Sequence, residues 1–228
     1  MSRLFIALVL LLASLVQLAV LCDPAIASGE RVLTYQLPFS YVDQSPAIGD
    51  LEGCGKQDIV INVMCGTIIA LNGSFDELWR WDDHSSDENT LPPTIADLNG
   101  DGKPEVLSLM MSGRLVCLEG KTGHLLWSAK LPSAVNLGTA VVVAADLEGD
   151  GKRDVLATDS KDTMTCFNAE GEVLWKFTDE AGLNTIPAAG DLYGDGKMEV
   201  VTGAPGAIGA LGPASAHPTV NVSMLPPP

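Results

Sequence analysis

Oxygen-bearing side chains recur at fixed spacing in one short segment of the chain. The segment ADLNGDGKPEVL, which begins at Ala96, places Asp97, Asn99, Asp101 and Glu105 at loop positions 1, 3, 5 and 9. A tight turn needs only one or two such residues. Calcium, by contrast, needs several oxygens that converge at about 2.3–2.6 Å. The spacing therefore predicts a calcium site as well as a turn.

The spacing matches only the first half of an EF-hand loop. Positions 1, 3 and 5, the glycine at position 6 and a main-chain carbonyl at position 7 agree with that loop. Position 12, however, is Ser108 where an EF-hand needs a bidentate glutamate, and an apolar strand-like run follows instead of a helix. We interpret the segment as a calcium loop between two strands, closed by the acid at position 9.

The chain repeats this loop four times, and the copies differ in their ligands. The first copy has Cys54 at position 5, and a neutral thiol is a poor calcium ligand, so no site is expected there. The fourth has Tyr193 at position 3, so a water would replace one ligand. We therefore expect two to three Ca²⁺ sites. With each lysine contributing its main-chain carbonyl, the expected ligands are Asp97, Asn99, Asp101, Lys103 and Glu105, then Asp146, Glu148, Asp150, Lys152 and Asp154, then Asp191, Asp195, Lys197 and Glu199.

The acidic loops and a set of tryptophans recur along the sequence with the same period. The loops begin at residues 50, 97, 146 and 191, which are 47, 49 and 45 residues apart, and Trp79, Trp127 and Trp175 are 48 residues apart. Each period holds four short strand-like runs separated by turn residues and no helical pattern. This is typical of β-propeller blades. We predict an all-β propeller of four-stranded antiparallel blades, about three complete and others partial, as a truncated chain, an open arc or a small ring, with the tryptophans packed between blades.

On these motifs the chain resembles the FG-GAP or VCBS repeats of integrin α-chain propellers and of many secreted proteins. The resemblance covers residues 29–205 and ends at Gly203-Ala204-Pro205. It implies calcium binding between the first two strands of a blade. The strands around Trp127 also resemble the repeats of quinoprotein propellers, although the quinone-site constellation of those enzymes is not visible in this sequence.

The two ends of the chain differ from the repeats in composition. Residues 1–27 carry Arg3 and an apolar run from Leu4 to Leu21, which predicts a secretory signal peptide or, alternatively, a retained signal anchor. Residues 29–38 resemble a lone last strand. Residues 206–228 are rich in Gly, Ala and Pro, and we expect an unfolded or loosely packed tail.

The net charge indicates which partners suit the chain, and the positions of the cysteines indicate whether they form disulfides. The net charge of −16 makes nucleic acid an unsuitable partner and favours cations among the carboxylates. Cys117 and Cys166 occupy equivalent repeat positions and are expected to be small buried residues, while Cys54 and Cys65 lie at opposite ends of one predicted strand. We therefore expect free thiols.

The leading functional hypothesis is a secreted or cell-surface, non-enzymatic binding or adhesion propeller. It would be extracytoplasmic and would meet a protein or glycan ligand through its loop tips. It would touch a membrane only if the N-terminal segment is retained as an anchor. The alternatives are a propeller enzyme, either a quinone-dependent dehydrogenase or a polysaccharide lyase, and a truncated fragment of a larger propeller.

Overall fold

The computed structural model describes residues 34–37, 44–63, 66–82, 87, 91–135, 141–178, 182–183, 186–204, 207–211 and 220–222. The chain divides into two units, Met1–Ser40 and Tyr41–Pro228, and every assigned strand lies in the second. The predicted signal segment and His84 lie outside the described residues. Residues 34–37 form no strand, so the expected lone strand at 29–38 is not present in its described part. No helix among the described residues is long and apolar enough to cross a membrane.

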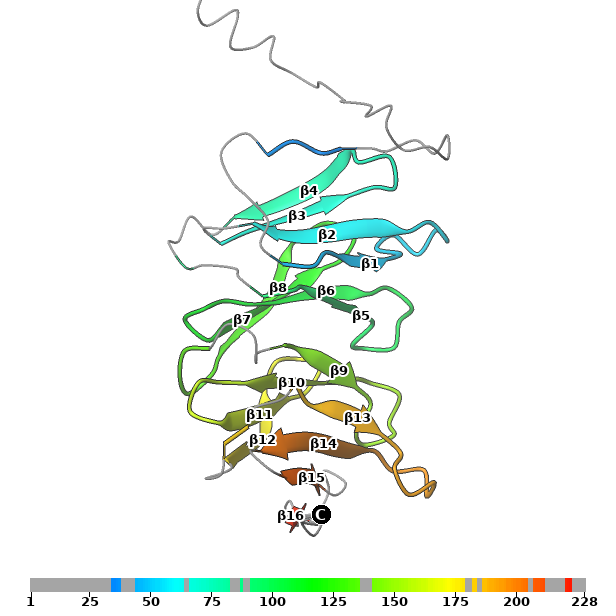
Figure 1. Cartoon of the computed structure of the whole chain (residues 1–228). Helices are drawn as coiled ribbons and strands as arrows, with labels where there is room; N and C mark the ends of the chain where they lie inside the picture. The colour runs from blue at the N-terminus through cyan, green and yellow to red at the C-terminus, as the bar shows by residue number, and fades with distance from the viewer. Residues whose placement is uncertain are drawn as a thin grey trace, which may run out of the picture. The chain divides into compact units, whose positions relative to one another are not determined.

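The strands form four separate antiparallel sheets of four strands each, in chain order (Figure 1). We call them blades 1 to 4. Blade 1 consists of β1 (Ala47–Gly49), β2 (Asp58–Val63), β3 (Thr67–Leu71) and β4 (Glu77–Asp82), and blade 2 of β5 (Thr94–Ala96), β6 (Glu105–Leu109), β7 (Arg114–Glu119) and β8 (Leu125–Lys130). Blade 3 consists of β9 (Val143–Ala145), β10 (Asp154–Thr158), β11 (Thr163–Phe167) and β12 (Val173–Thr178), and blade 4 of β13 (Ala188–Gly190), β14 (Glu199–Ala204), β15 (Ala207–Leu211) and β16 (Val220–Val222).

The central strands of blades 2 and 3 are buried on both faces because a neighbouring blade lies on each side. All five residues of β6 are buried, whereas β8 at the outer edge alternates between exposed and half-buried residues. Three apolar clusters join blade 1 to 2, 2 to 3 and 3 to 4. The innermost strands also touch in series, β1 to β5, β5 to β9 and β9 to β13. The predicted propeller architecture is confirmed, with blades that bury their faces on one another.

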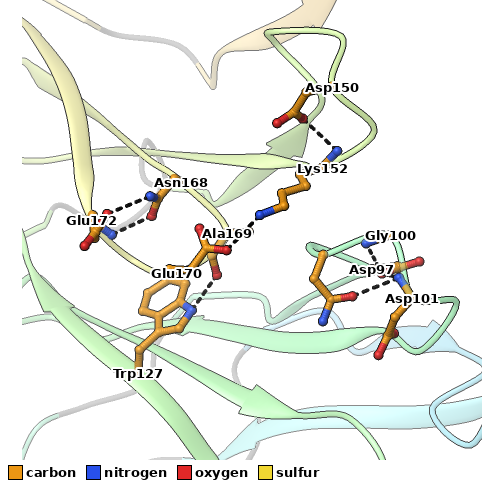
Figure 2. Close-up of polar contacts among 11 residues, drawn as sticks. Asp97, Gly100, Asp101, Trp127, Asp150, Lys152, Asn168, Ala169, Glu170 and Glu172 are labelled. Carbon is orange, nitrogen blue, oxygen red and sulfur yellow. Dashed lines mark hydrogen bonds and ion pairs between the residues drawn. The ribbon is translucent and has the colours of Figure 1, made fainter.

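The periodic tryptophans fasten one blade to the next. The Trp79 indole Nε1–H donates to the Gly120 carbonyl of blade 2 at 2.7 Å, and the Trp127 Nε1–H donates to the Ala169 carbonyl of blade 3 at 2.8 Å (Figure 2). Each ring lies directly over a glycine, and a Cβ added at Gly171 would sit 2.6 Å from the Trp127 ring. For these two tryptophans the expected packing between blades is confirmed.

The fourth blade is more complete than the composition suggested. Residues 207–211 and 220–222, expected to belong to an unfolded tail, instead form β15 and β16. β15 pairs with β14, which itself runs through the Gly203-Ala204 step, and β16 pairs with β15. Leu211 of β15 is buried against blade 3. The fourth unit therefore includes residues of the expected tail, because pairing with β14 orders the small residues of β15.

Candidate metal centre

Each acidic loop joins the innermost strand of a blade to its second strand. The four loops span residues 50–57, 97–104, 146–153 and 191–198, between β1 and β2, β5 and β6, β9 and β10, and β13 and β14. This is the position implied by the resemblance. The glycines at positions 4 and 6 all have positive φ, for example +76° at Gly100 and +82° at Gly102, a backbone conformation in which glycine is favoured.

The aspartate at position 1 organises the second loop. Its Oδ1 accepts the backbone N–H groups of Gly100 at 2.9 Å and Asp101 at 3.2 Å, and its Oδ2 accepts that of Gly102 at 2.8 Å. Asn99 Oδ1 accepts the Asp101 N–H at 2.8 Å. These bonds wrap the backbone around the Asp97 carboxylate and fix the turn. Two carboxylate oxygens offer about four acceptor sites, so they leave capacity for a cation.

The third and fourth loops repeat this arrangement. Asp146 accepts from the N–H groups of residues 149, 150 and 151 at 2.7, 3.1 and 2.9 Å. Asp191 accepts from those of residues 194, 195 and 196 at 2.6, 3.1 and 2.9 Å. The position-5 acids Asp101, Asp150 and Asp195 each accept the N–H of the lysine two residues later, at 2.8, 2.8 and 3.0 Å.

The acid at position 9 is buried in every copy. The exposed fractions of Asp58, Glu105, Asp154 and Glu199 are 3%, 6%, 7% and 1%. Each accepts the backbone N–H of the position-2 leucine, at distances of 2.8 to 3.2 Å. The position-9 acid therefore has a structural role that the sequence did not indicate. Its hydrogen bond to the position-2 N–H holds the start of the loop in place without a bound ion.

Burial and neighbouring carboxylates raise the pKa of Glu105 and of Asp154. Burial raises the pKa of Glu105 above its ordinary value, and the charges of Asp101 and Asp97 add to the effect. Burial raises the pKa of Asp154 to about 6, again with nearby acids contributing. Both carboxyls therefore lie in surroundings that disfavour their negative charge, which is the electrostatic setting that a bound cation relieves.

The first loop keeps the turn without the acid at position 5. Asp50 Oδ1 accepts the N–H of Cys54 at 3.0 Å, and its Oδ2 accepts that of Gly55 at 2.6 Å. The Cys54 side chain is exposed and lies 4.0 Å from a Glu52 carboxylate oxygen. The backbone shape of the loop therefore does not depend on a complete ligand set.

The donor set fits a hard cation, but its acids are not drawn together as tightly as a closed site requires. In the part of the chain that the structure describes, no group of three or more His, Cys, Asp or Glu side chains converges closely enough to hold a metal ion. The loop lysines turn toward other acids, since Lys152 Nζ lies 3.0 Å from Glu170 Oε1 and Lys103 Nζ 3.9 Å from Asp101 Oδ2. A cation at positions 1, 3 and 5 would draw in side chains such as the exposed Glu148.

Neighbouring loops touch along one edge of the blades. The Arg153 N–H donates to the Leu98 carbonyl at 2.8 Å, and a Cβ at Gly100 would lie 2.9 Å from the Gly151 carbonyl oxygen. Figure 2 draws Asp97, Gly100 and Asp101 of the second loop and Asp150 and Lys152 of the third. The two most complete ligand sets therefore lie next to each other.

The sequence from the second loop through the third matches the family model described as an FG-GAP-like repeat, over residues 97–157. The two best candidate loops belong to this segment. No curated protein matched the sequence.

Solved structures agree with the fold of the FG-GAP-like repeat and its neighbouring blades. BamB from Moraxella catarrhalis matches with a TM-score of 0.57 and 18% identity over 81% of this chain and 50% of its own. BBS1N, solved in complex with ARL6DN, matches with a TM-score of 0.60 and 11% identity over 87% and 59%. A europium-containing methanol dehydrogenase matches with a TM-score of 0.54 and 14% identity over 75% and 40%. At these identities the likeness shows the fold alone. This chain spans about half the length of these neighbours.

The raised pKa of Asp154 gives a testable pH dependence for the calcium-free protein. Because the folded state holds a proton that the unfolded chain releases above about pH 3.8, this residue's contribution to stability is greatest at low pH and is lost as the pH rises through about 6. We expect Asp154→Asn, which keeps an acceptor for the Leu147 N–H, to remove this decline from melting temperatures measured in chelator. Parallel profiles for the two proteins between about pH 4 and 7 would contradict the assignment.

Proposed function

We propose that this chain is a calcium-binding propeller module that acts outside the cytoplasm, secreted or at the cell surface, as a non-enzymatic binding or adhesion protein. The observation that carries the proposal is the shared build of loops 2, 3 and 4. In each, a carboxylate at position 1 gathers three backbone N–H groups, a second acid follows at position 5, and a third is buried below at position 9. Carboxylates that share one loop repel one another, and a cation among them would relieve that repulsion.

Calcium would be held by the residues predicted from the sequence. The second and third loops supply the fullest sets, around Asp97, Asp101, Asp146 and Asp150. The fourth lacks a position-3 ligand, because Tyr193 stands there with its side chain 66% exposed. The ion would supply charge neutralisation and cross-links between loop residues, and thus stiffen the edge on which the loops lie.

The proposed partner is a protein or a glycan that meets the loop tips. The net charge of −16 disfavours nucleic acid, and membrane contact would come only from a retained N-terminal segment. FG-GAP-like repeats and the likeness to BamB support an extracytoplasmic location. The likeness to a methanol dehydrogenase leaves a propeller enzyme as the alternative, since this fold serves both kinds of protein. A quinone titration followed by absorbance separates the two, and our proposal predicts no saturable binding.

Calcium titration calorimetry on chelator-treated protein tests the metal sites. We expect two to three sites in the wild type and a loss of two in the variant Asp101→Ala with Asp150→Ala. The first loop allows the opposite experiment, in which a calcium site is gained. Cys54→Asp supplies the missing position-5 acid and should add one site. A wild type that takes up no calcium, or an unchanged site count in all three proteins, would refute the calcium part of the proposal.

A further inference from the structure

The leucine at loop position 2 marks the side of a blade that faces the following blade. Leu51, Leu98 and Leu147 are 0%, 1% and 3% exposed, because each packs into the cluster shared with the next blade. The equivalent Leu192 of blade 4 is 57% exposed. This side of blade 4 therefore has an apolar residue with no covering blade.

A second position on this side behaves in the same way. Strand register makes Ile68, Leu115, Met164 and Ile208 equivalent, since each lies at the start of its third strand opposite the same residue of the second. The first three are fully buried, whereas Ile208 is 66% exposed. Blade 4 thus presents Leu192 and Ile208 on the side where blades 1 to 3 are each covered.

The junction between blades 1 and 2 shows which residues of the following blade pack against this side of a blade. A Cβ at Gly49, on the innermost strand of blade 1, would lie 2.9 Å from Ile95 Cγ2 of blade 2, so the glycine makes room for that isoleucine. On the same side, Leu51 lies against Gly120, whose added Cβ would be 3.3 Å from a Leu51 methyl. At this junction, Gly49 of blade 1 packs against Ile95 of blade 2, and Leu51 of blade 1 packs against Gly120 of blade 2.

Blade 4 and blade 1 carry the two halves of this junction in open form. Gly190 is equivalent to Gly49, and an added Cβ there would meet nothing within 4 Å. Ile48 of blade 1 is equivalent to Ile95, and it is 64% exposed. Gly73 of blade 1 is equivalent to Gly120 and is also exposed, so it could support Leu192 as Gly120 supports Leu51.

On the innermost strands of adjacent blades, a large residue pairs with a glycine, and an alanine pairs with an alanine. Gly49 meets Ile95 between blades 1 and 2, and an alanine faces an alanine at the equivalent positions of the next two junctions, Ala96 with Ala144 and Ala145 with Ala189. The remaining pair is Gly190 with Ile48, again a glycine with an isoleucine. The two open ends are therefore complementary in size.

We propose that blade 4 packs against blade 1 of a second copy of this chain, with Ile48 of one copy seated at Gly190 of the other and Leu192 resting on Gly73. Ile69 and Leu71 of blade 1 are already buried, so the contact centres on the innermost strand. Two such head-to-tail contacts join two copies into a closed pair of eight blades.

Light scattering coupled to size exclusion tests the pair with the full chain. The wild type should have twice the mass of one chain. Ile48→Glu, Leu192→Glu and Gly190→Leu should each weaken association at least about tenfold, which corresponds to about 1.4 kcal/mol. Gly190→Leu is the sharpest of these, because its side chain has open space within its own chain and should leave the melting temperature of the separated copy unchanged. Leu126→Glu on β8 is the matched control, since Leu126 is 52% exposed and lies outside the junction.

Mixing the variants distinguishes a head-to-tail contact from a symmetric one. Ile48→Glu and Leu192→Glu copies together retain one intact junction, so the mixture should regain a pair that is weakened in each variant alone. A wild type with the mass of a single chain overturns the proposal, and so do longer open assemblies. A pair lost in Leu192→Glu but kept in both Ile48→Glu and Gly190→Leu also overturns it, since blade 4 would then pair with itself.

Discussion

Chelation of calcium is expected to lower the melting temperature by roughly 10–20 °C. Each site held at a hundredfold excess over its dissociation constant stabilises the folded state by about 2.7 kcal/mol, so two sites contribute about 5 kcal/mol. In a chain of this size each kcal/mol shifts the midpoint by about 2–4 °C. The physical source is the relief of repulsion among loop acids such as Asp97, Asp101 and the buried Glu105, whose pKa is raised by its surroundings.

Thermal melts followed by circular dichroism, with calcium and with chelator, measure this shift. The variant Asp101→Ala with Asp150→Ala should melt near the temperature of the chelated wild type and respond little to calcium. Glu172→Ala, a matched loss of charge in a turn between β11 and β12, should keep the full response. Wild-type curves that coincide with and without chelator would remove the basis for calcium as a stabiliser.

Replacement of Trp127 by alanine is expected to cost about 3 kcal/mol of unfolding free energy. The indole fills the space between blades 2 and 3 over Gly171, and its N–H satisfies the Ala169 carbonyl. Loss of a large core aromatic costs about 3–5 kcal/mol, and we expect the lower end because this ring is only partly buried. Urea denaturation should show the loss as a lower midpoint with an unchanged slope.

Smaller changes at the same contact separate its components. Trp127→Phe keeps most of the apolar contact but loses the hydrogen bond, which should cost about 1 kcal/mol. Gly171→Ala places a methyl 2.6 Å from the ring at a φ of +82°, so it adds overpacking to backbone strain. Gly151→Ala, with a φ of +88° and no atom within 4 Å of an added Cβ, reports the backbone strain alone. Equal losses in the two glycine variants would show that the tryptophan contact adds nothing.

The fold was largely predictable because every repeat must bury the same faces. The period of the acid loops and of Trp79, Trp127 and Trp175 follows directly from that requirement, and the structure confirms four-stranded blades. The completion of blade 4 was not predictable in the same way. The AIGAL segment of β15 is small and rich in glycine and alanine, and only its register against β14, which pairs Leu211 with Val200, makes it a strand. Such pairing is a tertiary property that local composition does not contain.

The position of the candidate site was predictable from the sequence, but the different roles of its acids were not. Spacing identifies positions 1, 3, 5 and 9 as equals. Strand register separates them, because the pairing of Ala96 with Glu105, and of its equivalents in the other blades, places the position-9 acid beneath the loop, where it accepts the position-2 N–H. One sequence signal could have shown this, since the first loop loses the acid at position 5 but keeps Asp58.

The first loop has a consequence for how the molecule acquires its ions. Its turn closes around Asp50 although Cys54 replaces a ligand, so the backbone reaches its final shape through its own hydrogen bonds. If the other loops behave alike, the chain can fold during synthesis before it meets calcium, and the proposed ions arrive as late stabilisers of a finished scaffold. Dependence on calcium would then be graded loop by loop, and a single substitution could remove it from one blade without disturbing the next.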